Sequence, residues 1–325
     1  MAILVTGAAG FIGYHVAAAL LARGDRVVGI DNLNSYYDVR LKTARLARLE
    51  GQAGFGFHLA DIAEREAVAA VLRAHPEIRG IVHLAAQAGV RHSMLDPWSY
   101  LSSNLAGHLV MLEAARNMSH CQHLVYASSS SVYGANSELP FSEADRVDRP
   151  LSLYAATKRA DELMSHAYSH LYGIPQTGLR FFTVYGPWGR PDMAYFSFAR
   201  AILKGEPITV YDGGTLRRDF TYIDDIVSGV LGCLDRPPTD GRVPRLFNIG
   251  NSGSEAVNDL IELLEDSLGR KAIRQAAARP LADVPETFAS VEAIGALTGF
   301  APRTALSVGI PRFVAWFRDW VSREK

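Results

Sequence analysis

The 325-residue sequence has little of several features that define other classes of protein. It contains only two cysteines, Cys121 and Cys233, which lie far apart in apolar surroundings and indicate reduced core residues rather than a disulfide framework. No stretch reaches the roughly 18 unbroken apolar residues of a membrane span. The formal net charge is -1, which provides no overall basic field for nucleic acid. The ten histidines are scattered without metal-ligand spacing.

These absences, and an N-terminus that runs directly into a strand-like segment, lead us to expect a cytoplasmic enzyme. We expect no membrane anchor, no bound metal and no nucleic-acid partner. With 48% hydrophobic and 21% charged residues, the chain can bury a substantial core as one large or two unequal domains.

A glycine-rich turn follows the first predicted strand. Gly7, Gly10 and Gly13 stand between an apolar run of strand length and a helical pattern. A dinucleotide-binding loop needs this context, because the glycines let backbone N–H groups approach a pyrophosphate at the helix N-terminus. A second strand ends at Asp31, 18 residues after Gly13, where a carboxylate can accept hydrogen bonds from the adenosine ribose. Because an acid there repels a 2′-phosphate, we predict NAD rather than NADP.

Strands and helices then alternate as in a doubly wound parallel sheet. We predict further strands at residues 55–59, 80–85, 122–127 and 177–182. Ligands of such sheets bind beyond the carboxyl ends of the strands, where small residues let a cofactor backbone lie close. The predicted cofactor-binding residues are therefore Gly7, Gly10, Phe11, Ile12, Gly13, Asp31, Asn32, Asp61, Ile62, Leu84, Ala85, Ala86, Asn104, Tyr154 and Lys158.

Asn104 lies among apolar positions of a long helical pattern that starts near Pro97. Its side chain either is satisfied by nearby backbone or donates a hydrogen bond towards the cofactor. The sequence leaves both alternatives open.

Tyr154 and Lys158 are four residues apart at the start of another helical pattern, so they share one helix face. A free tyrosine titrates near about 10, but a neighbouring ammonium and a cationic nicotinamide would favour the phenolate and allow it to act as a base. By itself, a Tyr-x-x-x-Lys sequence is more typical of an ordinary amphipathic helix. The glycine loop and the hydroxyl cluster upstream favour the catalytic interpretation.

That hydroxyl cluster is the run of four serines at residues 128–131, at the end of a predicted strand. Serine runs are most often solvated turns. Here the run precedes Tyr154 by about one loop, so one hydroxyl can bind the same sugar oxygen as the phenol.

Beyond Phe182 the pattern changes to an aromatic, turn-rich loop followed by short helices and strands. We predict that Asp224 caps a helix at residues 226–234 and that a closing helix spans residues 311–320. We predict an NAD-binding Rossmann domain at residues 1–181, to which residues 221–248 return. Residues 182–220 and 249–325 form a smaller, mixed α/β lobe that binds the substrate. The fold class is α/β.

Together, the order of these motifs resembles the extended short-chain dehydrogenase/reductase family of nucleotide-sugar enzymes. The matches are the glycine loop, Asp31, the serine run, the Tyr154–Lys158 pair and the Arg218-Asp219-Phe220 segment. Within that family, the segments at residues 31–38, 152–158 and 180–193 are similar to UDP-glucuronate 4-epimerases. The resemblance implies reversible conversion of UDP-glucuronate to UDP-galacturonate with bound NAD. It also implies a homodimer formed through the helices that contain Asn104 and Tyr154.

In the chemistry that this resemblance implies, Tyr154 removes the proton of the C4 hydroxyl while hydride passes from C4 to NAD, and hydride then returns to the other face of the keto sugar. Ser129 matches the catalytic Ser or Thr of the family. A C4 ketone puts the C6 carboxylate at risk of leaving as carbon dioxide, so an epimerase must hold that carboxylate. Ser130, Ser131, Thr183 and Arg190 are the candidate clamps, since a carboxylate accepts hydrogen bonds from such donors.

The remaining substrate assignments follow from the same resemblance. Related dehydratases and decarboxylases carry an acid where this chain has serines at 129–131, which favours epimerisation alone. Arg218 matches a diphosphate-binding arginine and Asp283 a uridine-ribose acid, while Arg91 either borders the sugar or forms a structural salt bridge. The predicted substrate-binding residues are Gln87, Arg91, Ser129, Ser130, Ser131, Thr183, Arg190, Arg218 and Asp283.

Two other functions remain open at this point. One is a 4-epimerase of a neutral or N-acetylated UDP-hexose, for which Arg190 is not needed. The other is a non-catalytic NAD-sensing module on the same fold, although the chain retains both Tyr154 and Lys158.

Overall fold

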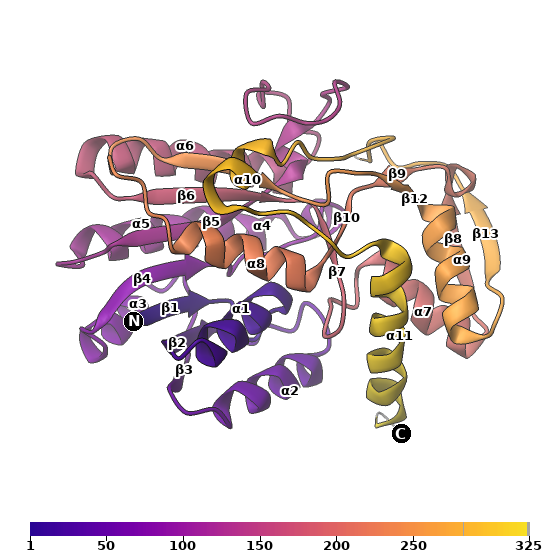
Figure 1. Cartoon of the computed structure of the whole chain (residues 1–325), viewed down its shortest axis with the longest axis horizontal. Helices are drawn as coiled ribbons and strands as arrows, with labels where there is room; N and C mark the ends of the chain where they lie inside the picture. Colours follow the sequence, from indigo (N-terminus) through magenta and orange to yellow (C-terminus); the bar gives the residue numbers. More distant parts are fainter. Residues whose placement is uncertain (282, 324–325) are drawn as a thin grey trace.

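The computed structural model describes residues 1–281 and 283–323. They form a three-layer α/β structure around a parallel sheet of seven strands in the order β11-β6-β5-β4-β1-β2-β3 (Figure 1). The predicted Rossmann fold is therefore confirmed. The strands of this sheet are β1 (Ala2–Thr6), β2 (Arg26–Asp31), β3 (Phe55–Leu59), β4 (Ile78–His83), β5 (His123–Ser129), β6 (Gln176–Phe181) and β11 (Arg245–Ile249).

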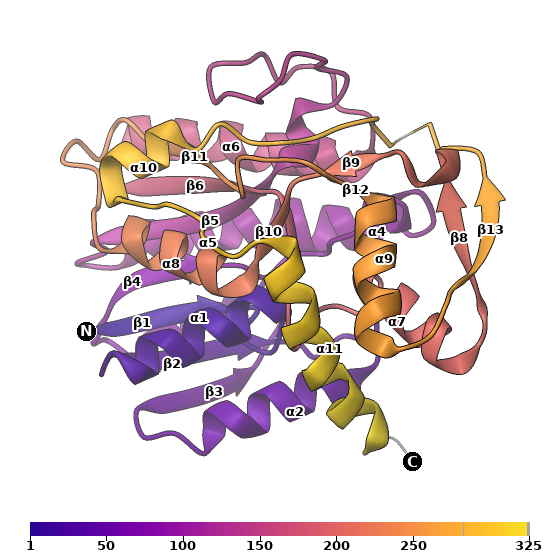
Figure 2. The same cartoon turned by 45° about the vertical axis from the view of Figure 1, so that its right-hand side comes forward.

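The central strands are largely buried because helices cover both faces of the sheet. Every residue of β1 and β6 is buried, as expected for a parallel sheet enclosed on two sides. Contacts between helices define the two covering layers (Figures 1 and 2). One contains α1 (Phe11–Ala22), α2 (Val39–Glu50) and α8 (Ile223–Leu234), and the other contains α3 (Arg65–Ala74), α5 (Gly107–Asn117) and α6 (Leu153–Tyr172).

The strand order reverses between β1 and β4, and this reversal positions the site. Chain connections run outwards in opposite directions from these two strands, which leaves a crevice beyond their carboxyl ends. β4 ends at His83, two residues earlier than predicted, so Leu84 and Ala85 lie in the loop at that crevice.

The long helix predicted from Pro97 is continuous but not regular. Asp96 caps it by accepting a hydrogen bond from the Ser99 N–H. α4 (Pro97–Tyr100) leads into a π-helical segment, η2 (Leu101–Ala106), before α5 begins. Such segments are often associated with functional sites, and this one contains the buried Asn104.

The helix that carries Tyr154 has well-defined ends. Ser152 accepts a hydrogen bond from the Ala155 N–H at the N-terminus of α6, and Gly173 adopts a left-handed conformation with φ 67° at its C-terminus. This capping fixes Tyr154 in the first turn of the helix.

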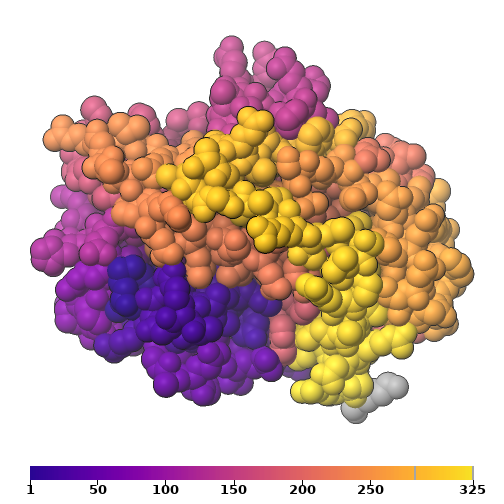
Figure 3. All heavy atoms as spheres, in the orientation of Figure 1, coloured from indigo at the N-terminus to yellow at the C-terminus, as the bar shows by residue number. Residues whose placement is uncertain are grey.

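The rest of the chain forms a smaller part beside the sheet (Figure 2). Its strand pairs are β7 (Thr183–Tyr185) with β10 (Phe220–Tyr222), β8 (Pro207–Tyr211) with β13 (Ile273–Ala277), and β9 (Arg217–Arg218) with β12 (Glu255–Ala256). Its helices are α7 (Ala194–Lys204), α9 (Val257–Leu268) and α11 (Leu306–Ser322), whereas α10 (Glu292–Thr298) packs against α8 and β11 of the main sheet. Short helical turns are η1 (His92–Met94), η3 (Ser130–Tyr133) and η4 (Asp212–Gly214). Figure 3 shows the yellow C-terminal segment lying along the surface beside α9.

Two predicted helix starts in the second half of the chain are wrong. α8 begins at Ile223 with Tyr222 at the N-cap, so Asp224 lies inside the first turn instead of capping it. α11 begins at Leu306, and Pro311 lies within the helix. Pro311 is in the second turn, where it has no N–H to donate to the carbonyl four residues earlier. The proposed domain boundaries stay a prediction, although β11 does pair with β6 in the main sheet.

Among the described residues, no helix combines the length and apolar character required to cross a bilayer.

Candidate active site

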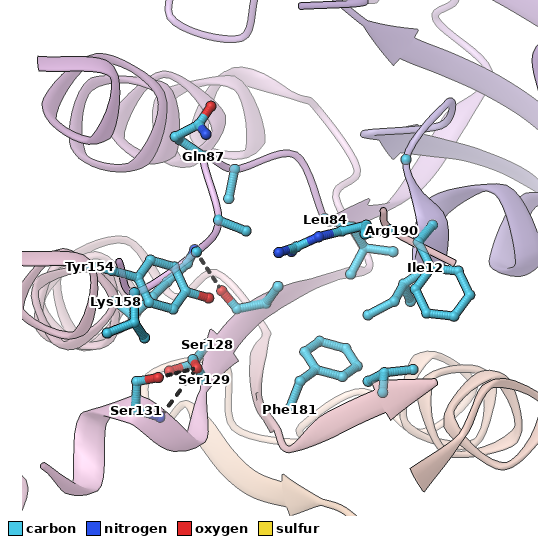
Figure 4. A pocket seen from close by; sticks show the side chains of 18 of the residues that line it. Ile12, Leu84, Gln87, Ser128, Ser129, Ser131, Tyr154, Lys158, Phe181 and Arg190 are labelled. Carbon is cyan, nitrogen blue, oxygen red and sulfur yellow. Dashed lines mark hydrogen bonds between the residues drawn. The ribbon is translucent and has the colours of Figure 1, made fainter. Parts of the chain in front are cut away.

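A deep pocket opens at the carboxyl ends of the central strands and extends to the smaller part of the chain (Figure 4). Most of the predicted site residues line it, although they come from elements far apart in sequence. They are Gly7, Gly10, Phe11, Ile12, Gly13, Asp31, Asn32, Ile62, Leu84, Ala85, Ala86, Gln87, Ser129, Ser130, Ser131, Tyr154, Lys158, Thr183, Arg190, Arg218 and Asp283.

Three predicted site residues do not line the pocket and have structural partners. Asn104 accepts a hydrogen bond from the Gln87 N–H at 2.8 Å and donates to the Gln87 carbonyl at 3.1 Å and to Thr157 at 3.0 Å. The side chain of Asn104 is thus satisfied by the Gln87 backbone and Thr157. It holds the loop of Gln87 because the buried amide already has its partners in the protein.

Asp61 and Arg91 do not line the pocket either, but each binds a residue that does. Asp61 accepts a hydrogen bond from the Asn32 amide at 2.8 Å and so orients a lining residue. Arg91 donates to Asp283 at 2.9 Å and to the Tyr211 hydroxyl at 3.3 Å. The salt-bridge alternative for Arg91 is the one that the structure contains, because its guanidinium reaches the acid and not the cavity.

The glycine loop is packed too closely for larger residues. Gly7 has φ +70°, and a Cβ on Gly13 would lie 2.0 Å from the Gly7 carbonyl oxygen. Gly10 is the N-cap of α1 and has no side chain to satisfy the first N–H groups, and the first turn contains no acidic residue. The N-terminus of α1 therefore presents free donors to an anion.

Asp31 is the last residue of β2, lies beside the glycine loop and is 8% exposed. Its carboxylate accepts hydrogen bonds from the Ala9 N–H at 3.1 Å and the Leu33 N–H at 2.9 Å, which fix it at the end of β2. Each carboxylate oxygen retains a free lone pair for a further donor. The open donors of α1 and this fixed acid fit the pyrophosphate and ribose of NAD.

Tyr154 and Lys158 lie together on one wall of the pocket (Figure 4). Lys158 is 4% exposed and donates hydrogen bonds to the Ala127 carbonyl at 2.9 Å and to Asp161 at 3.0 Å. Two fixed acceptors thus hold the ammonium at the end of β5, on the helix face that it shares with the phenol.

The serine run is not a solvated turn. Ser128 is buried and donates to the Glu162 carboxylate at 2.7 Å. Ser129 accepts a hydrogen bond from the Ser131 N–H at 3.2 Å, and its hydroxyl donates to that of Ser131 at 3.2 Å. Ser129 and Ser131 therefore lie beside each other below Tyr154 in Figure 4.

Arg190 lines the pocket and extends towards the wall that carries Tyr154 (Figure 4). It forms a two-pronged ion pair with Asp192, at 3.1 Å from Nε and 2.6 Å from Nη2. Burial opposes both charges, but each partner stabilises the other, so the pKa of Arg190 is raised and that of Asp192 is lowered. Asp192 also accepts a hydrogen bond from Tyr36 at 3.2 Å. The sequence did not predict this neutralisation of Arg190.

Arg218 and Asp283 lie at the far end of the pocket. Burial lowers the pKa of Arg218, and within the described residues no carboxylate forms an ion pair with it. Its Nη1 donates to the Arg217 and Pro285 carbonyls. A half-buried guanidinium without an ion pair among the described residues, at the edge of a cavity, suits a ligand anion.

Comparisons with known proteins agree with this arrangement. Residues 3–250 match the model of the NAD dependent epimerase/dehydratase family. UDP-glucuronate 4-epimerase 2 of Arabidopsis thaliana is 48% identical over 98% of this chain and 76% of its own length. The chain belongs to the NAD dependent epimerase/dehydratase family.

Two further proteins match this chain over nearly their whole length. A probable UDP-glucuronate 4-epimerase of Rhizobium meliloti is 46% identical over 98% of this chain and 97% of its own. The crystal structure of the Bacillus cereus UDP-glucuronic acid 4-epimerase, in complex with UDP-glucuronic acid and NAD, superposes with a TM-score of 0.91. Its sequence is 34% identical, and the match covers 98% of this chain and 100% of that one.

Several residues that shape the site of this family member are not predicted from the sequence. Arg45 is fully buried and donates to the Trp188 carbonyl at 3.0 and 2.7 Å, to the Gly189 carbonyl at 3.0 Å and to the Ala9 carbonyl at 2.9 Å. It therefore joins the loop before Arg190 to the glycine loop. In sequence, Arg45 is one of many helical arginines, so no local pattern indicates its role.

Other missed residues that line the pocket follow Asp31 closely in sequence, namely Asn34, Tyr36, Tyr37 and Lys42. Lys42 is 5% exposed and donates to the Asn34 backbone and side chain at 2.8 Å. Their position directly after Asp31, at the end of a predicted strand, is the signal by which they could have been found.

Proposed function

We propose that the chain catalyses reversible C4 epimerisation of UDP-glucuronate to UDP-galacturonate through a 4-keto intermediate, with tightly bound NAD. The observation that supports this most directly is that one pocket brings together Tyr154, Lys158, three serine hydroxyls and Arg190. The first two groups suit proton transfer from a sugar hydroxyl, and the others suit an acidic sugar. The named relatives act on the same substrate.

In this reaction Tyr154 takes the proton of the C4 hydroxyl and later returns it. Lys158, held by Ala127 and Asp161, supplies positive charge that favours the phenolate. Ser129 donates a hydrogen bond to the oxygen that Tyr154 deprotonates. Bound NAD would accept the C4 hydride and give it back to the opposite face of the sugar.

The carboxylate of the intermediate must be held so that carbon dioxide does not leave. Decarboxylation of a β-keto acid requires the breaking C5–C6 bond to align with the carbonyl π system. Hydroxyls of Ser130, Ser131 and Thr183 and the guanidinium of Arg190 are the proposed clamps. Residues 129–131 contain no acid for β-elimination, so epimerisation is favoured over dehydration.

The nucleotide is placed by residues from both parts of the chain. Arg218 provides a cation for the diphosphate, and Asp283, fixed by Arg91, can accept hydrogen bonds from the uridine ribose. Gln87 supports a further contact, because its side-chain Nε2 is buried and, in the part of the chain that the structure describes, has no hydrogen-bond partner. Burying an unpaired N–H donor costs free energy, and a ligand acceptor would offset this cost.

The deciding experiment is incubation of the purified protein with a panel of UDP-sugars, without added NAD, followed by identification of products by NMR. We expect UDP-galacturonate from UDP-glucuronate and no UDP-xylose-type product. Faster turnover of UDP-glucose or UDP-N-acetylglucosamine would favour the neutral-sugar epimerase. Bound NAD with no turnover of any UDP-sugar would favour the sensing module.

Arg190→Met should reduce kcat/KM for UDP-glucuronate about 100-fold, because loss of a buried charged partner costs about 3 kcal/mol. UDP-glucose turnover, if present in the parent, should not fall by the same factor. Since the substitution also leaves Asp192 unpaired, the double variant Arg190→Met/Asp192→Asn is the control. An equal loss for acidic and neutral sugars in both variants would count against the clamp.

We also propose a homodimer formed through the helices that carry Asn104 and Tyr154. Large apolar side chains are exposed on these helices, as expected of an interface with a second copy. They are Leu101 (37%), Leu109 (41%), Leu163 (55%) and Leu171 (64%).

Leu163→Arg should convert the dimer to a monomer in size-exclusion chromatography with light scattering, because a charge would be buried in the interface. Val308→Arg on α11, where Val308 is 44% exposed, is the matched control and should stay dimeric. A monomeric parent protein would contradict the proposed dimer.

A cytoplasmic location is likewise a proposal, and the two free cysteines are consistent with it.

A further inference from the structure

Lys158 has a buried acidic partner that the chemistry above does not use. Asp161 lies one turn further along α6, its side chain has no exposed surface, and one carboxylate oxygen accepts from the Lys158 ammonium at 3.0 Å. The other oxygen has no hydrogen-bond partner within the described residues. Burying a carboxylate with one unsatisfied oxygen costs free energy, so its presence beside the lysine needs a physical explanation.

The groups around this pair do not replace the charge of Asp161. The titratable groups that interact electrostatically with this pair are His83 on β4, His108 on α5, Tyr126 on β5 and the adjacent Glu162 on α6. Burial lowers the pKa of His108 to about 3 and that of His83 well below its usual value. Burial also raises the pKa of the Tyr126 phenol. The two histidines and this tyrosine are therefore neutral at pH 7.

The second buried acid of α6 faces elsewhere. Glu162 accepts from Arg180 at 2.8 and 3.0 Å, from Arg159 at 2.9 Å and from Ser128 at 2.7 Å. Its charge is thus balanced by two arginines. Of the described residues, Asp161 is the sole carboxylate in contact with Lys158.

We propose that Asp161 is a positioning residue for Lys158, and that its carboxylate keeps the ammonium charged and fixed beside Tyr154. The inference rests on the proposed function, since it assigns Asp161 a role through the proton-transfer pair. Without the carboxylate, a buried ammonium would have only the Ala127 carbonyl as a partner, and its neutral form would become easier to reach as pH rises.

The burial of Asp161 predicts a definite pH dependence of the reaction. Burial raises the pKa of the Asp161 carboxyl to about 6, although Lys158 favours its ionised form. Below this pH the natural residue is protonated and, like an amide, carries no charge. Above it, the natural residue is anionic, and only then does its charge support Lys158.

The test is the pH profile of kcat and kcat/KM for Asp161→Asn, with NAD content and KM for UDP-glucuronate measured alongside. Asparagine keeps the size and an oxygen acceptor but removes the charge. We expect the two profiles to converge below about pH 6. Above it, the alkaline decline of the variant should begin about one pH unit lower. NAD content should stay unchanged.

Glu162→Gln is the matched control, because it removes a buried carboxylate from the adjacent position of the same helix. It should lower thermal stability without moving the pH profile. If Asp161→Asn has the parent's profile and only a lower melting temperature, Asp161 is structural and the inference is overturned. If the parent itself does not turn over UDP-glucuronate, the proposed function fails instead, so the two failures are distinguishable.

Discussion

Tyr154→Phe is expected to lower kcat for epimerisation by about 10³- to 10⁴-fold while NAD stays bound. The substitution removes one oxygen, the atom that takes and returns the C4 proton, and leaves the ring in place. Lys158 keeps both of its acceptors, Ala127 and Asp161, so the pocket wall should keep its shape. The measurements are the steady-state rate with UDP-glucuronate and the NAD released by denaturation.

Tyr168→Phe is the matched control on the same helix. Its hydroxyl donates to Glu113 at 2.8 Å, and Tyr168 does not line the pocket. The control should retain the parent rate within about twofold, as is usual for substitutions away from a site. A Tyr154→Phe protein with an undiminished rate would show that another group is the base.

Gly13→Ala is expected to cause the second large effect, loss of the bound cofactor. The added Cβ would lie 2.0 Å from the Gly7 carbonyl oxygen and 3.3 Å from the Ala8 Cα. These are backbone atoms, so the loop itself must move away from the N-terminus of α1. Holding the loop in its binding conformation against such overpacking would cost about 3 kcal/mol, which corresponds to about 100-fold weaker NAD binding.

The control for this variant is Gly56→Ala in β3. A Cβ at Gly56 has no heavy atom within 4 Å in the described structure, and the residue does not line the pocket. Calorimetric titration of both NAD-depleted proteins would give the affinities, and circular dichroism would establish that each is folded. Equal affinities would mean that the loop is not the pyrophosphate site.

The main features of the fold could be predicted from local patterns. The glycine turn, the strand ending at Asp31 and the regular alternation of strands and helices follow from short-range rules of chain geometry and burial. The least accurate predictions concern helix starts, as at Asp224 and Pro311. Capping and first-turn positions have similar sequence preferences, and packing chooses between them.

The sequence by itself determined the chemical groups and their order along the chain: a glycine loop, an acid, a serine run and a tyrosine with a lysine one turn later. These groups are tied to local backbone geometry, which neighbouring residues specify. Only the tertiary structure decided that Asn104 holds the Gln87 backbone, that Arg91 pairs with Asp283, that Asp192 partly neutralises Arg190 and that Asp161 pairs with Lys158 beneath the pocket. Whether a charged or polar side chain reaches a ligand depends on which partners burial has already given it, and folding brings many of those partners from distant parts of the chain.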